Sequence, residues 1–178
     1  TKVDLARVLS PEHFALEKAR IFGKAWLHIG HTDALTGAGS YFVHDIPTLN
    51  ASLIAMRGDD GRVRVFHNAC RHRGNKLLRS GAGRAPVLRC GFHGWAFGAD
   101  GALKHVTDAH MFEDFDRSAY GLKEVRSAVW ENLLFVNFSQ AEPVSLEDWL
   151  GPEFHAQYQG YWDLHRCSAS YSFDLACN

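Results

Sequence analysis

The sequence predicts a mainly β fold of antiparallel sheets, with one helix near the N-terminus. A helix start stands at residues 10–12, two apolar segments flank a turn at 58–61, and short apolar runs separated by turns continue to residue 138. Hydrophobic residues make up 46% of the 178 residues and aromatic residues 12%, so the chain can bury a core and is not a disordered segment.

The helix is predicted at about residues 11–22. Ser10 is a suitable N-cap, Pro11 suits the first helical position, and Glu12 places an acid near the positive end of the helix. Apolar side chains follow at helical spacing, and Gly23 is expected to end the helix.

Short apolar runs bounded by turn residues predict the strands. They lie at residues 26–29, 53–56, 63–66, 87–88, 95–97 and 133–138, with turns at 37–39, 58–61, 100–101 and 131–132. A short helix is expected after Ser145, because Ser145 and Asp148 resemble a capping box, and the pair at 151–152 ends it. A last strand is predicted at 170–175, and a chain that stops directly after it is expected to be cut from a longer one.

The charge balance excludes some classes of partner. Nineteen Lys and Arg residues nearly cancel twenty Asp and Glu residues, and the net charge of −1 gives no electrostatic reason to expect nucleic acid or an anionic membrane. No apolar run approaches the roughly 20 residues of a membrane span, so we expect a soluble cytoplasmic protein. Four cysteines with no other sign of a secreted scaffold favour metal-binding thiolates in a reducing compartment.

The chemistry is concentrated in two short Cys/His motifs. Cys70 and His72 form the first motif, and Cys90 and His93 form the second after an interval of 17 residues. Each motif lies between predicted strands, so two loops brought tip to tip can bind two irons bridged by sulfides. The two cysteines then ligate one iron and the two histidines the other, as in Rieske [2Fe–2S] centres. Neutral imidazoles in place of thiolates raise the reduction potential from about −400 mV to roughly −150 mV or above.

Residues around these motifs are expected to support the cluster. Gly74, Gly91 and Gly94 allow close backbone approach and positive φ angles, so that amide N–H groups can point at the sulfurs. Trp95 and Phe92 are expected to wall the cluster from water on one side. The alternative is a structural zinc site, since two Cys and two His also form a tetrahedral zinc set. Common zinc spacings pair like ligands, whereas the order here alternates Cys, His, Cys, His.

With these motifs in place, the chain resembles the Rieske domain of ring-hydroxylating non-haem iron oxygenase α subunits. The resemblance rests on CRHRG at 70–74 and CGFHGW at 90–95, and extends to FALEKARIFGKAWLHIGH, WENLLFVNF and SYSFDLACN. It implies an N-terminal helix and connecting segment at 1–39, a Rieske [2Fe–2S] domain at 40–140, and at 141–178 a short helical linker with the first strand of a truncated catalytic domain. Respiratory Rieske proteins carry an additional cysteine in each cluster loop, and these loops have none.

The resemblance also implies a function for the intact protein. Electrons are expected from an NADH-dependent reductase, with or without a ferredoxin, and the electron leaves through His93. It then reaches a mononuclear Fe(II) in the missing catalytic domain of a neighbouring subunit, where O2 is activated against an aromatic substrate in aromatic hydrocarbon catabolism. The expected assembly is a homotrimer or α3β3. The alternative is a stand-alone Rieske-type ferredoxin that carries electrons and has no catalytic half.

Other polar residues of the chain are not assigned to the metal centre. His105 and His110 have the H-x4-H spacing of an iron site, with Asp108 between them, but they follow a hairpin turn and are interpreted as ordinary surface histidines. Arg71 and Arg73 are solvated loop charges or attract an acidic electron donor.

Overall fold

We describe the chain from a computed structural model, in which residues 5–112 and 114–162 and positions 169, 171, 173 and 175 are described. The helices are α1 (Ala6–Leu9), α2 (Pro11–Glu17), a π-helix (Lys18–Phe22), α3 (Leu146–Leu150) and α4 (Pro152–Tyr158). The strands are β1 (Leu27–His31), β2 (Ser40–Ile46), β3 (Ala51–Arg57), β4 (Val63–His67), β5 (Ala82–Arg84), β6 (Val87–Arg89), β7 (Ala96–Gly98), β8 (Leu103–His105), β9 (Glu124–Trp130) and β10 (Leu133–Asn137). Short 3₁₀ helices lie at Thr32–Ala34, Pro47–Leu49, Ala109–Met111 and Arg117–Tyr120.

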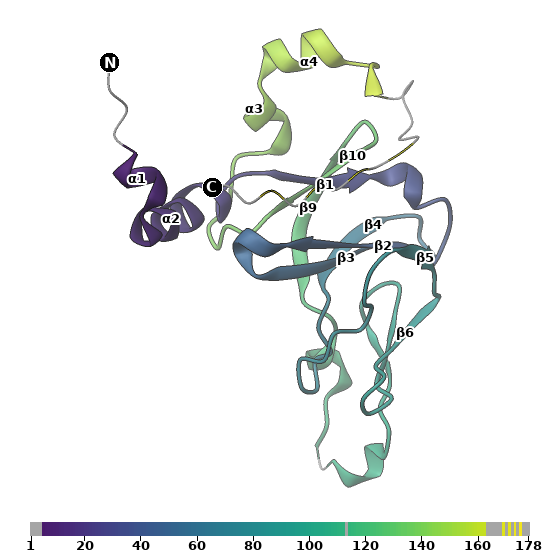
Figure 1. Cartoon of the computed structure of the whole chain (residues 1–178). Coiled ribbons are helices and arrows are strands. Elements are labelled where there is room, and N and C mark those ends of the chain that lie inside the picture. The colour runs from purple at the N-terminus through teal and green to yellow at the C-terminus, as the bar shows by residue number, and fades with distance from the viewer. Residues whose placement is uncertain are drawn as a thin grey trace.

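Two antiparallel sheets make up the β structure. The larger sheet has seven strands in the order β1-β10-β9-β4-β3-β2-β5, and the smaller has three in the order β6-β7-β8. Figure 1 shows α3 and α4 beyond one end of the larger sheet, and β6 with its neighbouring loops extending from the other end. The predicted mainly β fold of antiparallel sheets is therefore confirmed.

Most of the predicted elements are confirmed, with small shifts in their bounds. Ser10 caps α2 through the N–H of His13, and the helix continues to residue 22 in π form. Ser145 likewise caps α3 through the N–H of Asp148, but Pro152 opens a further helix, α4, that the sequence did not predict. Strands β2, β5, β8 and β9 were also missed, and the strand predicted at 170–175 lies outside the continuously described residues. The division at 39 and 140 stays a prediction.

The larger sheet has a hydrophobic core on each of its two faces at strand β3. Successive strand residues point to opposite faces, and all four central residues of β3 are fully buried. Leu53 and Ala55 pack inside the larger sheet, whereas Ile54 and Met56 pack toward the smaller sheet, in the core that also contains Cys70 and Cys90. A third core beneath α3 and α4 is built from the following residues: Trp26, Trp130, Leu133, Phe135 and Leu146. The core that contains both cysteines is therefore packed against one face of β3.

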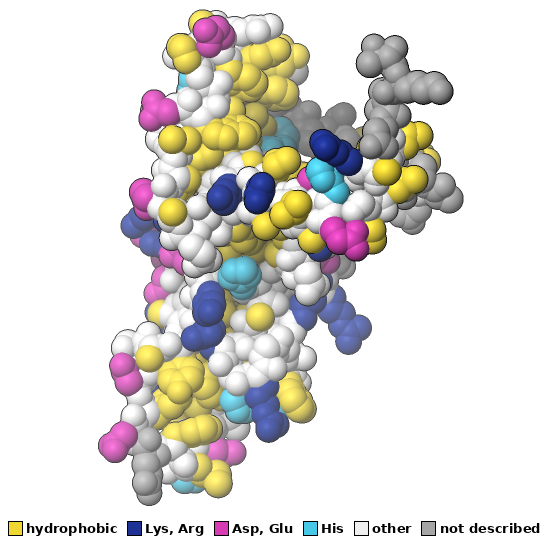
Figure 2. Space-filling view, turned by 90° about the vertical axis from the view of Figure 1, so that its left-hand side faces the viewer, with side chains coloured by type: hydrophobic (Ala, Val, Ile, Leu, Met, Phe, Trp, Pro, Cys, Tyr) yellow, Lys and Arg dark blue, Asp and Glu magenta, His cyan; other side chains and the backbone are white. Residues whose placement is uncertain are grey.

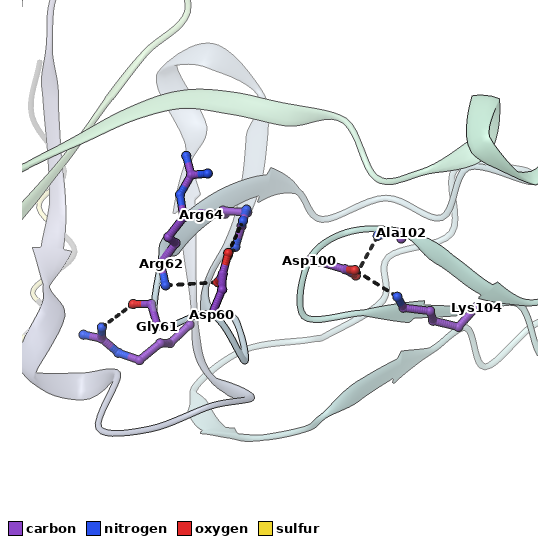
Figure 3. A network of polar contacts seen from close by, with 8 residues as sticks. Asp60, Gly61, Arg62, Arg64, Asp100, Ala102 and Lys104 are labelled. Carbon is purple, nitrogen blue, oxygen red and sulfur yellow. Dashed lines mark hydrogen bonds and ion pairs between the residues drawn. The ribbon is translucent and has the colours of Figure 1, made fainter.

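Two hairpins use the same seven-residue pattern, which is Gly-x-Asp-Gly-x-apolar-cation. In the turn between β3 and β4, Asp60 accepts the N–H of Arg62 at 3.1 Å and pairs with Arg64 at 2.6 Å. In the turn between β7 and β8, Asp100 accepts the N–H of Ala102 at 3.0 Å and pairs with Lys104 at 2.9 Å. Figure 3 shows both turns from close by. The hairpin at 58–61 was predicted, but the match between the two turns was not recognised in the sequence.

Three histidines on the strands predict that the fold weakens in mild acid. Burial lowers the pKa of His28, His44 and His67 below the usual value, with positive neighbours adding to the effect at His28 and His67. Between the lowered folded-state pKa and about 6.5 in the unfolded chain, the unfolded state binds more protons. The free energy of unfolding should therefore fall as the pH drops below about 6.5. Hydrogen bonds and ion pairs lower the pKa of Asp45, Asp60 and Asp100, and this contribution is lost only below about pH 4.

Denaturant unfolding of the wild-type chain and of a triple variant tests this expectation. Replacing His28, His44 and His67 by Gln should flatten the stability profile between about pH 8 and about pH 5. The wild-type profile should decline over the same interval. Identical slopes for the two proteins would show that these histidines do not set the acid sensitivity.

None of the helices among the described residues is long and apolar enough to span a membrane.

Candidate metal centre

The first Cys/His motif lies in a tight loop that follows β4. The N–H of Cys70 donates to the carbonyl of Asn75 at 2.8 Å, and the N–H of Gly74 donates back to the carbonyl of Cys70 at 2.8 Å. Gly74 has φ of +73°, a left-handed value that costs other residues about 1–2 kcal/mol. The loop therefore closes on itself within the six residues from Cys70 to Asn75 and holds His72 near its tip.

The second motif repeats this backbone arrangement between β6 and β7. The N–H of Cys90 donates to the carbonyl of Trp95 at 2.7 Å, and the N–H of Gly94 donates to the carbonyl of Cys90 at 3.1 Å. Gly94 has φ of +72°, almost equal to that of its counterpart in the first loop. Two loops of one geometry thus face each other, as the interpretation of the sequence requires.

The structure brings the two cysteine side chains together in the core. Cys70 and Cys90 are each only 3% exposed, are not joined in a disulfide, and belong to the same core cluster. Burial raises the pKa of the Cys70 thiol. Burial acts the same way on Cys90, but N–H groups of Phe92 and His93 point at its sulfur and the net effect lowers the pKa of Cys90. The sulfur of Cys90 is therefore already surrounded by donors that stabilise a thiolate.

The two imidazoles form a second pair at the loop tips. The ring centroids of His72 and His93 are 4.7 Å apart, and the indole of Trp95 stacks on His72 at 4.8 Å with an interplanar angle of 10°. The Nδ1 atom of His72 is buried and has no hydrogen-bond partner among the described residues. A buried ring nitrogen without a partner is costly unless something coordinates it. This atom fits a metal ligand, and the residues present fit a two-iron cluster.

The arrangement separates a thiol pair from an imidazole pair, which bears on the zinc alternative. A structural zinc ion needs four ligands that converge on one point. Among the residues that the structure describes, no three His, Cys, Asp or Glu side chains converge on a position for a single ion. Two separate pairs of this kind match the ligand arrangement of a Rieske centre, in which two cysteines and two histidines serve different irons.

Two details of the predicted surroundings are wrong. Gly91 does not have a positive φ angle, because the left-handed position in its loop falls at Gly94 instead. Phe92 lies against the ring of His93 at 3.8 Å but is 60% exposed, so it does not shield the site from water. Trp95, by contrast, is only 2% exposed and covers His72 as expected.

A buried asparagine that sequence reasoning missed holds the end of the first loop. Asn68 is 3% exposed, and its Oδ1 accepts the N–H groups of Leu77 and Leu78, each at 3.0 Å. Its Nδ2 donates to the carbonyl of Leu78 at 2.7 Å and to Ser52 Oγ at 3.0 Å. One side chain thus satisfies the backbone where the first loop returns to the core.

Asn68→Ala is expected to lower the free energy of unfolding by about 3 kcal/mol, because two partly buried N–H groups lose their acceptor at about 1–3 kcal/mol each. Ser52→Ala removes a single partner of the same side chain, together with the exposed hydrogen bond from Ser52 to Asp45, and should cost about 1 kcal/mol. Urea unfolding of the two variants measures the difference. Equal losses would mean that Asn68 does not organise this loop.

The other candidate histidines lie apart from this centre. His105 ends β8, His110 lies in the 3₁₀ helix that follows, and Asp108 between them precedes that helix with φ of +52°. His105 and His110 are exposed. They remain interpreted as surface residues.

An open groove of about 650 Å³ lies beside the imidazole pair. Its lining comprises His72, Phe92, His93, Gly94, Trp95, Thr107, Asp108, Met111 and Phe112. Met111 is 74% exposed, and Figure 2 shows hydrophobic side chains gathered on the lower part of the molecule beside His and basic side chains. The imidazole side of the centre therefore faces an accessible apolar surface, whereas the thiol side faces the core.

Comparison with known protein families agrees with this geometry. The family model of the Rieske [2Fe-2S] domain matches residues 25–116, which include both loops. The chain therefore belongs to the Rieske [2Fe–2S] domain family, whose cofactor is the Rieske [2Fe–2S] cluster.

The similar proteins are subunits of Rieske oxygenases. The chain is 36% identical over 148 residues to the glycine betaine monooxygenase oxygenase subunit of Chromohalobacter salexigens, covering 80% of this chain and 33% of that protein. It is 34% identical over 142 residues to the chlorobenzene dioxygenase subunit alpha of a Cupriavidus species, covering 78% of this chain and 30% of that protein. The chain thus spans about a third of these relatives and corresponds to their Rieske part.

A solved structure supports the same assignment. A quaternary ammonium Rieske monooxygenase, studied for carnitine oxidation by gut microbiota and inter-subunit electron transfer, superposes with a TM-score of 0.76 at 29% identity. The match covers 84% of this chain and 40% of that one. Relatives thus include oxygenases named for aromatic compounds and others named for quaternary ammonium compounds.

Proposed function

We propose that this chain is the electron-relay part of a Rieske non-haem iron oxygenase, with a cluster held by Cys70, Cys90, His72 and His93. The observation that carries the proposal is the separation of a buried thiol pair from an imidazole pair on two matching loops. A Rieske [2Fe–2S] cluster bound there supplies a one-electron redox centre at a higher potential than an all-cysteine cluster. Gly74, Gly94 and Trp95 shape its surroundings in this proposal, and Gly91 completes the second loop.

The four proposed ligands lie at two ends of the site, one buried and one near the surface. Cys70 and Cys90 hold one metal position inside the core, where water is excluded. His72 and His93 hold the other at the surface, beside the open groove. Electron transfer outward is thereby directed through the imidazole side, and we assign His93 as its exit. The acceptor in this proposal is a mononuclear iron in the catalytic domain of a neighbouring subunit, within a homotrimer or α3β3 assembly.

The substrate of the intact enzyme is part of the same proposal. The family resemblance implies an aromatic compound, and relatives named for chlorobenzene, biphenyl and benzene support it. Relatives named for glycine betaine and carnitine support a quaternary ammonium compound equally well. The general activity proposed is therefore oxygenation of a small organic molecule with O2.

The charge distribution supports an acidic electron donor. Residues 61–99, which contain both loops, include no Asp or Glu and eight basic residues: Arg62, Arg64, Arg71, Arg73, Lys76, Arg79, Arg84 and Arg89. Arg64 and Lys76 are paired with Asp60 and Asp45. Arg73, next to a proposed ligand, is exposed. An acidic ferredoxin or reductase would be attracted to this segment.

Electron uptake by the cluster-loaded chain tests the proposed function. Reduction by an acidic ferredoxin should consume about one electron per chain and slow markedly as the salt concentration rises from about 0.01 M to about 1 M, since the screening length falls from about 30 Å to about 3 Å. Arg73→Gln should lower the low-salt rate about threefold, whereas Arg62→Gln, on a hairpin away from the loops, should not. A chain that binds the cluster but accepts no electron would refute the relay function.

A further inference from the structure

The two cluster loops interlock through equivalent residues. The fifth residue after each cysteine closes its own loop through its carbonyl, and these residues are Asn75 and Trp95. Each side chain then reaches across to a proposed ligand of the opposite loop. Trp95 stacks on His72, and Asn75 donates from Nδ2 to the sulfur of Cys90 at 3.7 Å. The histidine side and the sulfur side therefore each receive one side chain from the other loop.

The orientation of the Asn75 amide is determined by its second contact. Nδ2 also lies 3.0 Å from the carbonyl oxygen of Lys76, which can only accept a hydrogen bond. The amide nitrogen must therefore face that carbonyl, and its two N–H groups match two acceptors, the carbonyl and the Cys90 sulfur. The neighbouring Lys76 is itself fixed, because its ammonium binds both carboxylate oxygens of Asp45 at 3.1 Å and 3.0 Å.

We propose that Asn75 tunes the reduction potential of the bound cluster through this N–H···S hydrogen bond. The inference rests on the proposed ligand role of Cys90. Reduction adds one negative charge to the metal centre, and a donor aimed at a ligand sulfur stabilises the more negative state. Hydrogen bonds to the sulfurs are among the factors that set the potentials of iron–sulfur proteins. Asn75 therefore makes this cluster easier to reduce than the backbone alone would.

Two substitutions at this position give graded expectations. Asn75→Leu keeps the size of the side chain and removes the donor, so the reduction potential should fall. The expected fall corresponds to about a threefold to tenfold change in the redox equilibrium constant, where a tenfold change is about 59 mV for one electron. Asn75→Asp places a carboxylate beside the sulfur and should lower the potential further. Voltammetry of the cluster-loaded chains measures both shifts without any turnover assay.

A charge-neutral variant controls for loosening of the loop. The double variant Asp45→Asn, Lys76→Met removes the ion pair next to Asn75 without changing the net charge, and leaves the amide in place. Its potential should stay at the wild-type value. An unchanged potential in Asn75→Leu would overturn the proposal, and so would equal falls in Asn75→Leu and the double variant.

A second measurement needs no variant that must assemble a cluster. Wild-type chain labelled with ¹⁵N only in asparagine side chains should show a ¹⁵N hyperfine coupling to the reduced cluster in pulsed EPR, transmitted through the hydrogen bond. Absence of this coupling would overturn the inference even if Asn75→Leu fails to bind iron. A wild-type chain that binds no cluster would overturn the ligand assignment as well, whereas a bound cluster without coupling would overturn the role of Asn75 alone.

Discussion

Cys90→Ser is expected to leave the chain almost without iron and sulfide. Serine has a similar size, so the 3%-exposed position stays filled, but its hydroxyl does not replace a thiolate as an iron ligand. Loss of residues that merely support a ligand costs about 10–100-fold in metal affinity, so loss of the ligand itself should cost at least about 100-fold. Iron and acid-labile sulfide analysis after reconstitution, together with the visible spectrum, measures the effect.

The same experiment on histidine variants distinguishes cluster ligands from histidines that do not bind the cluster. His72→Gln should lose the cluster, because the buried Nδ1 is the atom available for coordination. His67→Gln is the matched control, since His67 ends β4 shortly before the first loop and contacts the ring of Phe138 instead. His67→Gln should keep its iron. Wild-type iron content in Cys90→Ser or in His72→Gln would remove that residue from the ligand set.

Gly101→Ala should be among the most destabilising substitutions in the chain. Gly101 has φ of +78°, and a Cβ atom there would lie 2.5 Å from the ring of Phe66, which is itself only 1% exposed. The left-handed backbone costs about 1–2 kcal/mol, and overpacking adds about 1–3 kcal/mol. We expect a loss of about 3–4 kcal/mol in the free energy of unfolding, measured with urea.

The equivalent turn provides the control for this prediction. Gly61 occupies the same position in the other Gly-x-Asp-Gly hairpin, with φ of +76°, but a Cβ atom there would meet nothing within 4 Å. Gly61→Ala should therefore cost only the backbone term of about 1–2 kcal/mol. Because Phe66 shares its core with both cysteines, Gly101→Ala should also lower cluster occupancy. Equal losses in the two variants would contradict the predicted clash.

The site was more predictable from the sequence than the details around it. The sequence alone identifies the four proposed ligands, because their types, order and spacing are rare outside metal centres. These residues are Cys70, His72, Cys90 and His93. Hairpins such as that at 58–61 follow from local turn chemistry. Strand β9 does not, because its central residues alternate little in polarity, and its bounds depend on pairing with β10, which follows directly, and with β4, which lies far earlier in the chain.

The residues that stabilise the two cluster loops have no recognisable local pattern in the sequence. Asn68 and Asn75 look like ordinary loop asparagines, and their roles depend on contacts with Leu77, Leu78 and Cys90 that exist only after folding. Phe92 was misjudged for the related reason that an aromatic residue beside a ligand can face either the core or solvent. Exposure at such a position is decided by the loop conformation.

The most direct test of the central claim is the EPR spectrum of the dithionite-reduced chain, combined with iron and zinc analysis. Ligation by two cysteines and two histidines predicts about two irons per chain and a rhombic signal whose average g value lies below that of the free electron. A colourless, EPR-silent protein with one zinc per chain would contradict it, because the same four residues would then form a structural site and the electron relay would be lost.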